Sequence, residues 1–406
     1  MGDQAEVVEL KNYDLLVVGA GPSGATVAKV AAKNGLNILL IEKVKEGGPR
    51  KACGGIVRGF YGKEIPKNLV DHELLGMIIY SPSGNTAEVR LTEPCLVIAR
   101  EKLDSWMAQQ AVEKGATFEQ GTSARKFIRR GDFIKVELKR ESRSKVISCR
   151  AVVGADGALS TVARSFGLVS RTSPEDYIYC YEYFVKMDAK LIEDNFSGFS
   201  EVFYSTKYAK GFYSWLEPAG TCLIAGTGCV GSPVLAKSSL EEFVRKHPGA
   251  IKKVQGTIVQ RKAGIIWLKK PKRTYAKQAL LVGDAAGMVS PFTGEGIHFA
   301  IQSGRIAGDV LSEILSKGRP RTTDFQLYEQ RWKKEFWREQ RRDVDLRNRF
   351  MQNDERLEML VKFLGYDCLN RYVAQSLSSN PPGKLDDFLL QLKMGLKTLF
   401  HGPRKP

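Results

Sequence analysis

A strand–helix–strand unit near the N-terminal end constrains the fold more than any other feature of the sequence. The apolar run at residues 13–18 predicts a buried parallel strand. It leads into the turn GAGPSG (19–24), and the small residues that follow at helical spacing predict a helix. Residues 37–41 predict a second buried strand, which ends at Glu42. This order is typical of the βαβ unit of a Rossmann-type domain.

Each part of this unit suits a bound dinucleotide. Gly19 permits the tight turn, Gly21 lets the backbone approach a pyrophosphate, and Gly24 lets the helix pack closely on the strand. The helix N-terminus offers N–H groups and a partial positive charge to the phosphates. Glu42 is placed to accept hydrogen bonds from ribose hydroxyls. The alternative is a glycine-rich turn without a ligand, and the motif alone does not separate FAD from NAD.

Two later stretches repeat the pattern of an apolar strand that runs into a polar turn. AVVGADGALSTVAR (151–164) places Asp156 and Gly157 after one strand, and ALLVGDAAGMVSPFTGEGIHFAIQSG (279–304) places Asp284 after another. An Asp at the end of a buried strand suits ligand hydroxyls, although an Asx-type turn is the alternative. In the second stretch a glycine-rich loop precedes a helix expected from about Ile297, and such a helix N-terminus stabilises negative charge.

The order GxGxxG, Asp-Gly, Gly-Asp over residues 13 to about 304 resembles the flavoprotein family that includes aromatic hydroxylases, flavin halogenases and geranylgeranyl reductases. The resemblance implies FAD as the cofactor, with Asp284 at the ribityl chain and Arg100 near the phosphates. It also implies an α/β fold. A Rossmann-type FAD-binding domain, glutathione-reductase-like and of the hydroxylase subclass, is joined by an inserted antiparallel-sheet substrate domain and C-terminal helices. The residues expected to bind FAD are Gly19, Gly21, Ser23, Gly24, Glu42, Lys43, Cys53, Gly54, Arg100, Asp156, Gly157, Asp284, Pro291, Gly294, Gly296 and Ile297.

The middle of the chain predicts mostly β-structure. Residues 121–153 read as a three-stranded meander, and residues 176–230 alternate aromatic and polar residues, as in an antiparallel sheet with one packed face. A short helix is expected at 239–247, with Ser238 or Ser239 as its N-cap. We therefore expect FAD-binding segments at 1–60, 99–174 and 275–320, substrate-domain segments at 61–98 and 175–274, and a C-terminal helical region at 321–406.

The stretch YSWLEP (213–218) resembles the YxWxFP motif of geranylgeranyl reductases, with Glu217 where that family usually has Phe. Aromatic residues two apart lie on one face of a strand, so Tyr213 and Trp215 are expected to wall an apolar cavity. A plain core strand is the alternative, because aromatic residues at this spacing are common in sheets. The resemblance makes Tyr213, Trp215 and Pro218 the candidate substrate-binding residues.

Cys53 lies in GPRKACGGIV (47–56), where K-A-C-G-G resembles the K-P-C-G-G of the same reductases. The seven cysteines are odd in number, widely spaced and without a CxxC pair, and the four histidines are scattered. This usage indicates reduced, mostly buried thiols of a cytoplasmic protein and no metal site. Arg50 and Lys51 would lower the pKa of the Cys53 thiol. Two roles stay open for Cys53: a bare turn, or a candidate catalytic thiol that lines the flavin–substrate pocket and tunes its reactivity.

The net charge of +17 implies attraction to anionic surfaces. Residues 328–352 predict a long charged helix with Trp332, Phe336 and Trp337 near one face, and the tail at 389–406 is basic and amphipathic. Both segments suit docking on an anionic membrane, and a helical cap with a solvated basic face is the alternative. His298 falls in an apolar run, where a packed histidine is favoured over a catalytic acid.

These patterns favour a flavin-dependent prenyl reductase of the geranylgeranyl or digeranylgeranylglycerophospholipid reductase type. The alternatives are a flavin monooxygenase or halogenase, and a non-enzymatic prenyl-binding protein. The expected partners are a prenyl lipid or prenyl diphosphate, a reduced donor such as NADPH or a ferredoxin-like protein, and the surface of an anionic membrane, with no nucleic acid. The sequence contains no second dinucleotide fingerprint, so a nicotinamide donor would react only transiently.

Overall fold

The computed structural model describes residues 11–45, 51–59, 61, 64–169, 171–366, 370, 371, 373 and 374. The chain divides into two compact units. The first unit comprises residues 1–51, 100–177 and 265–345, and the second comprises 52–99, 178–264 and 346–406. The assignment of some segments to cofactor binding and others to substrate binding remains a prediction.

The first unit is built on a mostly parallel sheet. Its strands follow the order β15 (Tyr275–Ala276), β16 (Ala279–Leu281), β9 (Arg143–Gly154), β1 (Asn12–Val18), β2 (Ile38–Glu42) and β6 (Thr117–Gln120). All the pairings along this order are parallel except β15 with β16. Val18, the last residue of β1, lies opposite Ile41 and Gly154. The carboxyl ends of β1, β2 and β9 therefore meet at one edge, where ligands bind in open α/β sheets.

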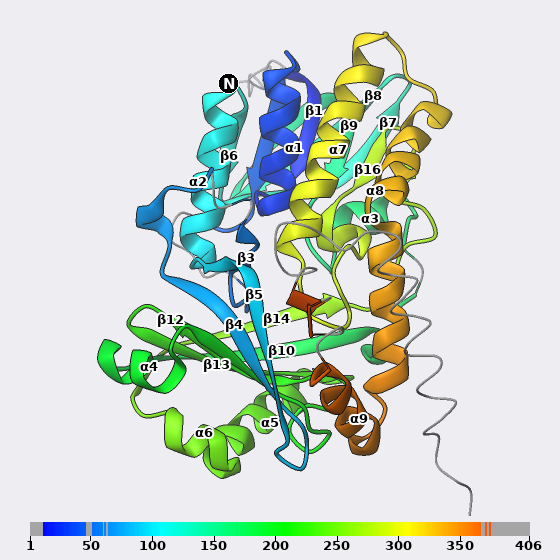
Figure 1. Cartoon of the computed structure of the whole chain (residues 1–406). Coiled ribbons are helices and arrows are strands. Elements are labelled where there is room, and N and C mark those ends of the chain that lie inside the picture. The colour runs from blue at the N-terminus through cyan, green and yellow to red at the C-terminus, as the bar shows by residue number, and fades with distance from the viewer. Residues whose placement is uncertain are drawn as a thin grey trace, which may run out of the picture. The chain divides into compact units, whose positions relative to one another are not determined.

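Helices α1 (Pro22–Lys33), α2 (Arg100–Glu113) and α7 (Ile297–Ser316) cover one face of this sheet (Figure 1). Helix α1 packs against both of the others. A Cβ on Gly304 of α7 would lie 2.5 Å from the Ser23 carbonyl oxygen, and one on Gly308 would lie 2.7 Å from Val30. The small residues of α1 and α7 thus allow the two helices to approach closely.

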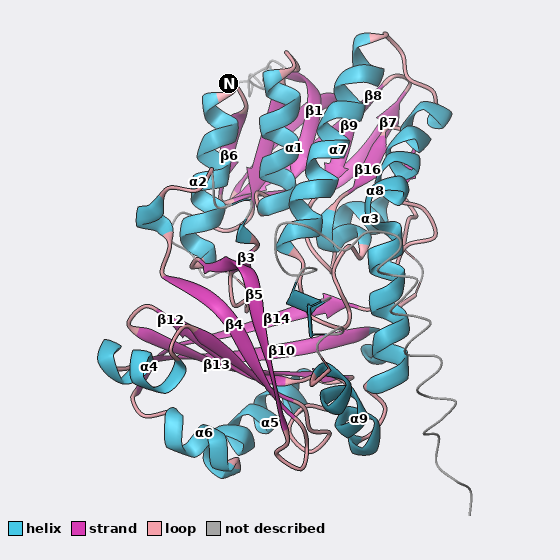
Figure 2. Ribbon diagram, viewed as in Figure 1, coloured by secondary structure: helices cyan, strands magenta, loops and turns pink. Residues whose placement is uncertain are grey.

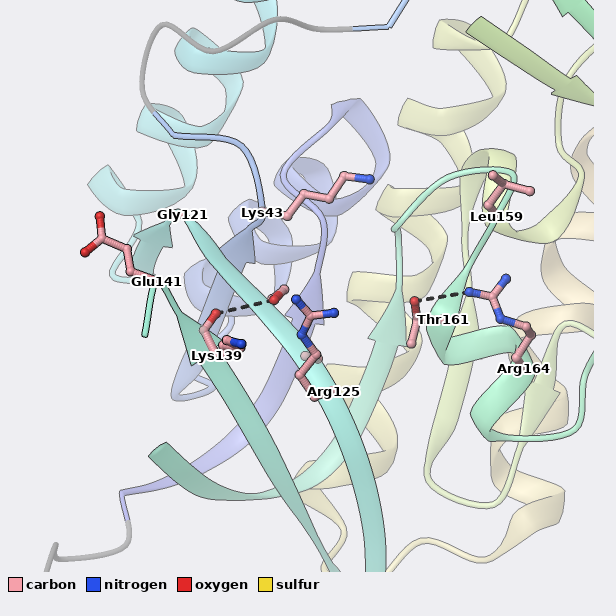
Figure 3. Close-up of a pocket in the computed structure, with 10 residues that line it drawn as sticks. Lys43, Gly121, Arg125, Lys139, Glu141, Leu159, Thr161 and Arg164 are labelled. Atoms are coloured by element: carbon pink, nitrogen blue, oxygen red, sulfur yellow. Dashed lines mark hydrogen bonds between the residues drawn. The ribbon is translucent and has the colours of Figure 1, made fainter. Parts of the chain in front are cut away.

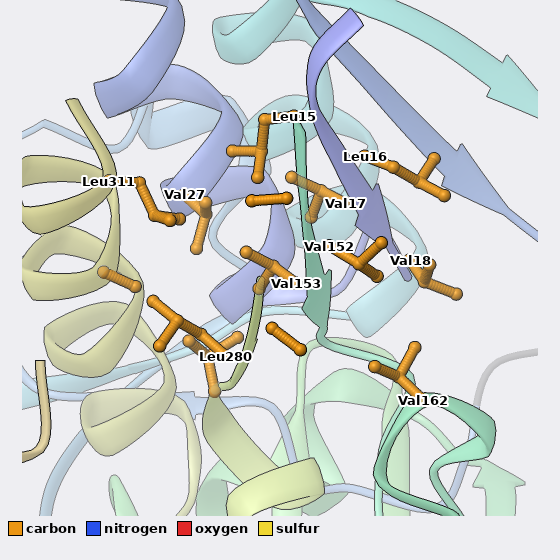
Figure 4. Close-up of a cluster of buried hydrophobic side chains, with 14 of the residues drawn as sticks. Leu15, Leu16, Val17, Val18, Val27, Val152, Val153, Val162, Leu280 and Leu311 are labelled. Carbon is orange, nitrogen blue, oxygen red and sulfur yellow. The ribbon is translucent and has the colours of Figure 1, made fainter. Parts of the chain in front are cut away.

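The core of the first unit forms between the central strands and these helices. Figure 4 shows Leu16, Val152 and Leu280 from the strands together with Val27 of α1 and Leu311 of α7. The predicted meander is confirmed as β7 (Thr122–Arg130), β8 (Phe133–Arg140) and β9, and its inward side chains join the same core. The sheet and helices therefore bury a continuous apolar interior, as the near-continuous apolar strands predict.

Helix α8 (Thr322–Phe350) uses its aromatic side chains inside the protein. Trp332 and Phe336 are buried in the core of the first unit, and the Trp332 indole N–H donates to Thr274 Oγ1 at 2.9 Å. This packing supports the helical cap for α8 rather than membrane docking by its aromatic face. The basic tail at 389–406 lies outside the described residues.

The second unit contains a mixed sheet. Its strands follow the order β14 (Thr257–Trp267), β10 (Tyr177–Lys186), β13 (Cys222–Val230), β12 (Ser214–Ala219), β11 (Phe199–Phe203), β4 (His72–Tyr80), β5 (Thr86–Val97) and β3 (Ile56–Val57). β11 pairs with β4 in parallel, whereas β10, β13, β12 and β11 pair antiparallel with one another. The predicted antiparallel sheet with one packed face is confirmed for these strands. Figure 2 shows helices lying along that face.

The packed face carries α5 (Pro233–Lys246). Leu216, Leu223 and Ala225 of the sheet form a buried cluster with Leu240 and Phe243 of α5. The remaining helices are α3 (Thr161–Ser165), α4 (Ala189–Phe196), α6 (Pro248–Lys253) and α9 (Asp354–Leu364).

The helix predicted at 239–247 corresponds to α5, but its predicted start was wrong, because α5 begins at Pro233. Its N-cap is Ser232, whose Oγ accepts a hydrogen bond from the Leu235 N–H at 3.3 Å. A serine followed by proline is itself a helix-start signal. Across the described part of the chain, no helix combines the length and the apolar character needed to cross a membrane.

Candidate functional site

The glycine turn after β1 requires glycine at two positions. Gly19 has φ +102°, and a Cβ there would lie 2.4 Å from the Ala155 carbonyl oxygen. A Cβ on Gly24 would lie 1.8 Å from the Gly19 carbonyl oxygen. The turn therefore packs backbone on backbone, which brings the start of α1 to the carboxyl edge of the sheet.

The start of α1 faces a fixed guanidinium. A Cβ built on Gly21, the N-cap, would lie 3.8 Å from Arg100 Nη2. Arg100 is buried and pairs with Asp104, with Nε to Oδ1 and Nη2 to Oδ2 both at 3.0 Å. The first turn of α1 contains no acidic residue and no side-chain cap. N–H groups at a helix start beside an oriented cation fit a diphosphate.

Glu42 is held beside this turn at the end of β2. Its Oε2 accepts the Ala20 N–H at 3.0 Å and its Oε1 accepts the Val44 N–H at 3.0 Å. A carboxylate can accept several hydrogen bonds, which suits the ribose hydroxyls predicted for Glu42. Ser23 is buried, and a Cβ on Gly283 would lie 2.7 Å from its Oγ, so the first and third motifs pack directly together.

A basic pocket of about 550 Å³ opens next to Glu42. Lys43 enters it from the end of β2, Arg125 and Lys139 from the meander, and Arg164 from α3 (Figure 3). Arg164 Nη2 donates to Thr161 Oγ1 at 3.4 Å. Of these four basic residues only Lys43 was predicted as a site residue from the sequence, and Arg125 and Lys139 of the meander belong to no motif. The remaining lining residues are Gly121, Ser123, Ala124, Glu141 and Leu159.

The Asp156 carboxylate accepts hydrogen bonds from residues at the start of helix α3. Its carboxylate accepts from Ser160 Oγ at 2.5 Å and from the backbone N–H groups of Thr161 at 2.6 Å and Val162 at 3.2 Å. Burial raises the pKa of Asp156, and these hydrogen bonds counteract part of that rise. Asp156 thus fixes the start of α3, and its predicted contact with the cofactor stays a prediction. Gly157 follows with φ +79°, which favours glycine.

The third motif brings Asp284 to the N-terminus of α7. Asp284 lies in a 3₁₀ turn, Gly283–Ala286, and pairs with Lys51 Nζ. A Cβ on Gly296, the N-cap of α7, would lie 3.4 Å from Asp284 Oδ1. The first turn of α7, from Ile297, contains no acidic residue. The Asp284 carboxylate, which is predicted to bind ribityl hydroxyls, therefore lies next to a helix start that favours negative charge.

The loop between these elements is fastened internally. Ser290 Oγ accepts from the Thr293 N–H at 3.0 Å, and the Gly294 N–H donates to the Ser290 carbonyl at 2.9 Å. Gly294 has φ +73°, and the neighbouring Pro291 is buried. His298 is buried against Phe299, with ring centroids 5.2 Å apart, as expected for a packed histidine.

The Cys53 segment is a turn with two backbone constraints. Gly55 has φ +74°, and a Cβ there would lie 2.0 Å from the Ile98 carbonyl oxygen. A Cβ on Gly54 would lie 2.5 Å from Glu217 Oε2. Cys53 is half-buried, and its backbone N–H donates to Glu182 Oε2 at 3.0 Å. Arg50, one of the two bases expected beside the thiol, lies outside the described residues.

The three candidate substrate-binding residues lie on two different faces of β12, with Tyr213 and Trp215 on one face and Pro218 on the other. The rings of Tyr213 and Trp215 contact edge to face, with centroids 5.7 Å apart. A Cβ on Gly226 would lie 2.2 Å from Trp215 Cε2, so the indole lies directly on β13. Pro218 lies opposite Leu223 on the other face, which packs on α5. The structure therefore brings Tyr213 and Trp215 together, and does not bring Pro218 to them.

Two buried glutamates, Glu182 and Glu217, share the face of Trp215 and were not assigned a role from the sequence. A signal for the first was available, because Glu182 interrupts the aromatic run YIYCYEYFV. A buried charge in such a run is rare unless it is paired or functional. Glu217 was noted only as a departure from the YxWxFP motif.

Within the described part of the chain, no group of three or more His, Cys, Asp or Glu side chains is arranged to hold a metal ion. Six cysteines fall in that part, and none of these six forms a disulfide. Cys95, Cys149, Cys180 and Cys229 are buried.

Comparisons with known proteins agree with this architecture. A protein-family model described as "Lycopene cyclase protein" matches residues 14–379. The digeranylgeranylglycerophospholipid reductase of Methanocaldococcus jannaschii is 30% identical over 378 residues, 91% of this chain and 96% of that protein. Digeranylgeranylglycerophospholipid reductase 1 of Methanopyrus kandleri is 32% identical over 337 residues, 80% of this chain and 87% of that protein.

A solved structure shares the whole architecture. The geranylgeranyl bacteriochlorophyll reductase-like protein of Thermoplasma acidophilum superposes with a TM-score of 0.80 at 25% identity, covering 95% of this chain and 100% of that one. The family and fold predicted from the motifs are confirmed. The chain belongs to the digeranylgeranylglycerophospholipid reductase family of FAD-dependent oxidoreductases, within the broader family described as lycopene cyclase protein.

Proposed function

We propose that this chain reduces isolated double bonds in the prenyl chains of a lipid. The observation that carries the proposal is the edge-to-face pair of Tyr213 and Trp215, which lies on the sheet of the second unit within a YxWxEP sequence. Rigid aromatic rings of this kind supply a large apolar wall for a branched hydrocarbon chain. Relatives named digeranylgeranylglycerophospholipid reductase support the same substrate class.

The residues of the first unit fit FAD. Arg100 and the first turn of α1 would hold its diphosphate, and Glu42 would accept the ribose hydroxyls. The pocket beside Glu42 would take the adenine, because the guanidinium planes of Arg125 and Arg164 can stack on an aromatic ring. Asp284 and the start of α7 would lie along the ribityl chain and the flavin. When bound and reduced, FAD supplies a hydride.

The protein itself would position the alkene, exclude water from it and stabilise the charge of the reduced flavin. An isolated alkene is a poor electrophile, so most of the catalysis must come from holding it in one position away from water. The aromatic face of β12 would provide that wall. The N-terminus of α7, with no acid in its first turn, would stabilise the negative charge of a reduced flavin ring.

The partners follow from the charge and the motifs. The substrate is a prenyl lipid or a prenyl diphosphate, and the net charge of +17 favours its anionic head and an anionic membrane surface. The electron donor is NADPH, reacting transiently, or a ferredoxin-like protein, because the sequence has a single dinucleotide fingerprint.

An anaerobic reaction tests substrate and chemistry together. FAD-loaded protein, reduced with dithionite, is mixed with an unsaturated prenyl lipid, and the product is read by mass spectrometry. We expect a mass gain of two hydrogens per reduced double bond. Oxygen-dependent turnover with a hydroxylated or halogenated product would identify a monooxygenase or halogenase. A protein that binds the lipid but cannot be loaded with FAD would identify a prenyl-binding protein.

A matched pair of variants sharpens the test. Trp215→Leu removes the indole from the proposed wall and should lower turnover at least about tenfold, because the contact of a substrate chain with an indole contributes on the order of 2 kcal/mol. Trp337→Leu changes a tryptophan that packs beside the core of the first unit, and should leave the turnover of folded protein unchanged. The FAD absorption spectrum of both variants serves as the check on folding.

A further inference from the structure

Two buried carboxyl groups project from one face of the sheet in the second unit. Glu182 of β10 lies opposite Gly226 of β13, and Glu217 of β12 lies opposite Ile224 of the same strand. Because Gly226 and Ile224 are two residues apart, both glutamates point to the same side. Their side chains are only 1% and 4% exposed. This is the side opposite α5, so neither carboxyl group belongs to the packed core beneath that helix.

The surroundings of Glu217 favour its neutral form. Its Oε1 is buried and has no hydrogen-bond partner, and no described basic side chain forms an ion pair with it. Burial, and after it the charge of Glu182, raises the pKa of Glu217 well above its usual range. Burial beside another carboxyl group therefore favours the protonated form of Glu217 over the carboxylate.

Glu182 is bound by the main chain of the Cys53 turn. The Cys53 N–H donates to its Oε2 at 3.0 Å, which stabilises the ionised form. Glu182 accepts this backbone N–H, whereas Glu217 Oε1 has no hydrogen-bond partner among the described residues. Of the two groups, Glu217 is therefore the one whose protonated form is favoured.

Glu217 continues the aromatic stripe proposed as the substrate wall. Tyr213, Trp215 and Glu217 alternate along the chain, so their side chains share one face. Tyr213 and Trp215 are half-buried, whereas Glu217 is buried. The turn at Gly54 approaches the Glu217 carboxyl so closely that a Cβ would lie 2.5 Å from Oε2. A proton-bearing group thus stands at the buried end of an apolar wall.

We infer that Glu217 is the acid that protonates the alkene. This inference rests on the proposed function. A hydride adds to one alkene carbon, and the π electron pair forms the second C–H bond with the proton of Glu217. Glu217 is left as a carboxylate, and water restores its proton after each turnover. The related motif usually carries Phe at this position, so the assignment concerns this chain and relatives that share its glutamate.

The test compares Glu217→Gln with wild-type protein, both loaded with FAD. Glutamine keeps the size of the side chain and cannot supply the proton. In single-turnover experiments with a prenyl lipid we expect Glu217→Gln to lower the rate at least about 100-fold, the usual contribution of a general acid. The rate of dithionite reduction of its flavin should be unchanged. The wild-type rate should fall as pH rises through the raised pKa of Glu217, and this dependence should vanish in the variant.

Infrared spectroscopy gives a readout that needs no turnover. Wild-type protein at neutral pH should show the carbonyl band of a protonated carboxyl group, and Glu217→Gln should remove it. Glu201→Gln is the matched control, because Glu201 is equally buried in this sheet but is paired with Lys253. That control should keep both the band and the turnover. Glu217→Phe restores the residue of the motif and should also lose the band and the rate.

The possible results separate the two proposals. A Glu217→Gln protein with the wild-type rate and pH profile, or a wild-type protein without the protonated band, overturns the assignment of Glu217 while the reductase function stands. A wild-type protein that leaves every prenyl lipid unreduced overturns the function and the assignment with it.

Discussion

The backbone N–H of Cys53 donates to Glu182 Oε2 at 3.0 Å, so Cys53 holds a buried carboxylate through its main chain. This contact joins a turn near the N-terminal end to strand β10 of the second unit. It does not use the sulfur atom. The turn and the thiol can therefore have separate roles, which substitutions can distinguish.

Cys53→Ala tests the thiol alone, because alanine keeps the N–H that binds Glu182. We expect the unfolding free energy to change by no more than about 0.5 kcal/mol, as for other substitutions that leave such contacts intact. If the thiol lines the substrate pocket, as the sequence predicts, the pattern of reduced double bonds should shift. Mass spectrometry of partly reduced products measures this pattern, and an unaltered rate and pattern would leave Cys53 with its backbone role only.

The two glycines after Cys53 should respond differently to alanine. Gly55→Ala places a Cβ 2.0 Å from the Ile98 carbonyl oxygen at φ +74°, and should cost at least about 2 kcal/mol of stability. The atoms nearest to a Cβ on Gly54 belong to the end of the Glu217 side chain and not to backbone, so the cost of Gly54→Ala should stay near about 1 kcal/mol. Its main effect should be on turnover, because it displaces the proposed acid. Denaturant unfolding and single-turnover rates separate the two, and equal stability losses would contradict this account.

The strands and helix starts that depend on residues only a few positions away could be predicted from the sequence. The strand expected at 13–18 is found at Asn12–Val18, and α7 begins at Ile297 as expected. Both follow from apolar runs and glycines that act within a few residues. The start of α5 was missed although Ser232 and Pro233 marked it, since the apolar pattern further along was given more weight.

The glutamate pair could not be predicted, because it depends on strand register. Cys53 and Glu182 are 129 residues apart, and Glu217 joins them only because β13 pairs with both β10 and β12. A shift of one residue in either pairing would turn one carboxyl group to the other face. The basic pocket also depends on strand pairing and could not be predicted, because the meander places Arg125 and Lys139 beside Lys43.

Arg100 should hold the FAD diphosphate as well as Asp104, and a double substitution separates these roles. Arg100→Ala removes the buried bidentate partner of Asp104 and should cost about 3 kcal/mol of stability. Arg100→Met combined with Asp104→Leu replaces the pair by apolar side chains and should recover most of that loss. FAD affinity should fall at least about tenfold in both proteins. Fluorescence titration measures it, and full FAD affinity in the double variant would exclude Arg100 from the diphosphate site.

The basic pocket should contribute to FAD affinity and not to the chemistry. Arg164→Ala removes a guanidinium that can stack on adenine, and should weaken FAD binding about fivefold. With saturating FAD the rate of lipid reduction should return to the wild-type value. Lys135→Ala, an exposed lysine of β8 outside the lining, is the control and should bind FAD normally. A lasting loss of rate at saturating FAD would place Arg164 in the reaction itself.

The raised pKa of Glu217 predicts how stability depends on pH. The folded protein holds a proton that the unfolded chain releases above about pH 4.5, the ordinary value for this group. Between that value and the raised pKa the folded state binds more protons, so stability falls as pH rises, by at most about 1.4 kcal/mol per pH unit. The contribution is complete below the ordinary value and is lost through the folded pKa. Glu217→Gln has no such proton, so its stability relative to wild type should increase as pH is raised from about 5 to about 8. Urea unfolding of both proteins at several pH values measures this difference, and parallel pH profiles would show that Glu217 ionises at its usual pKa in the folded protein.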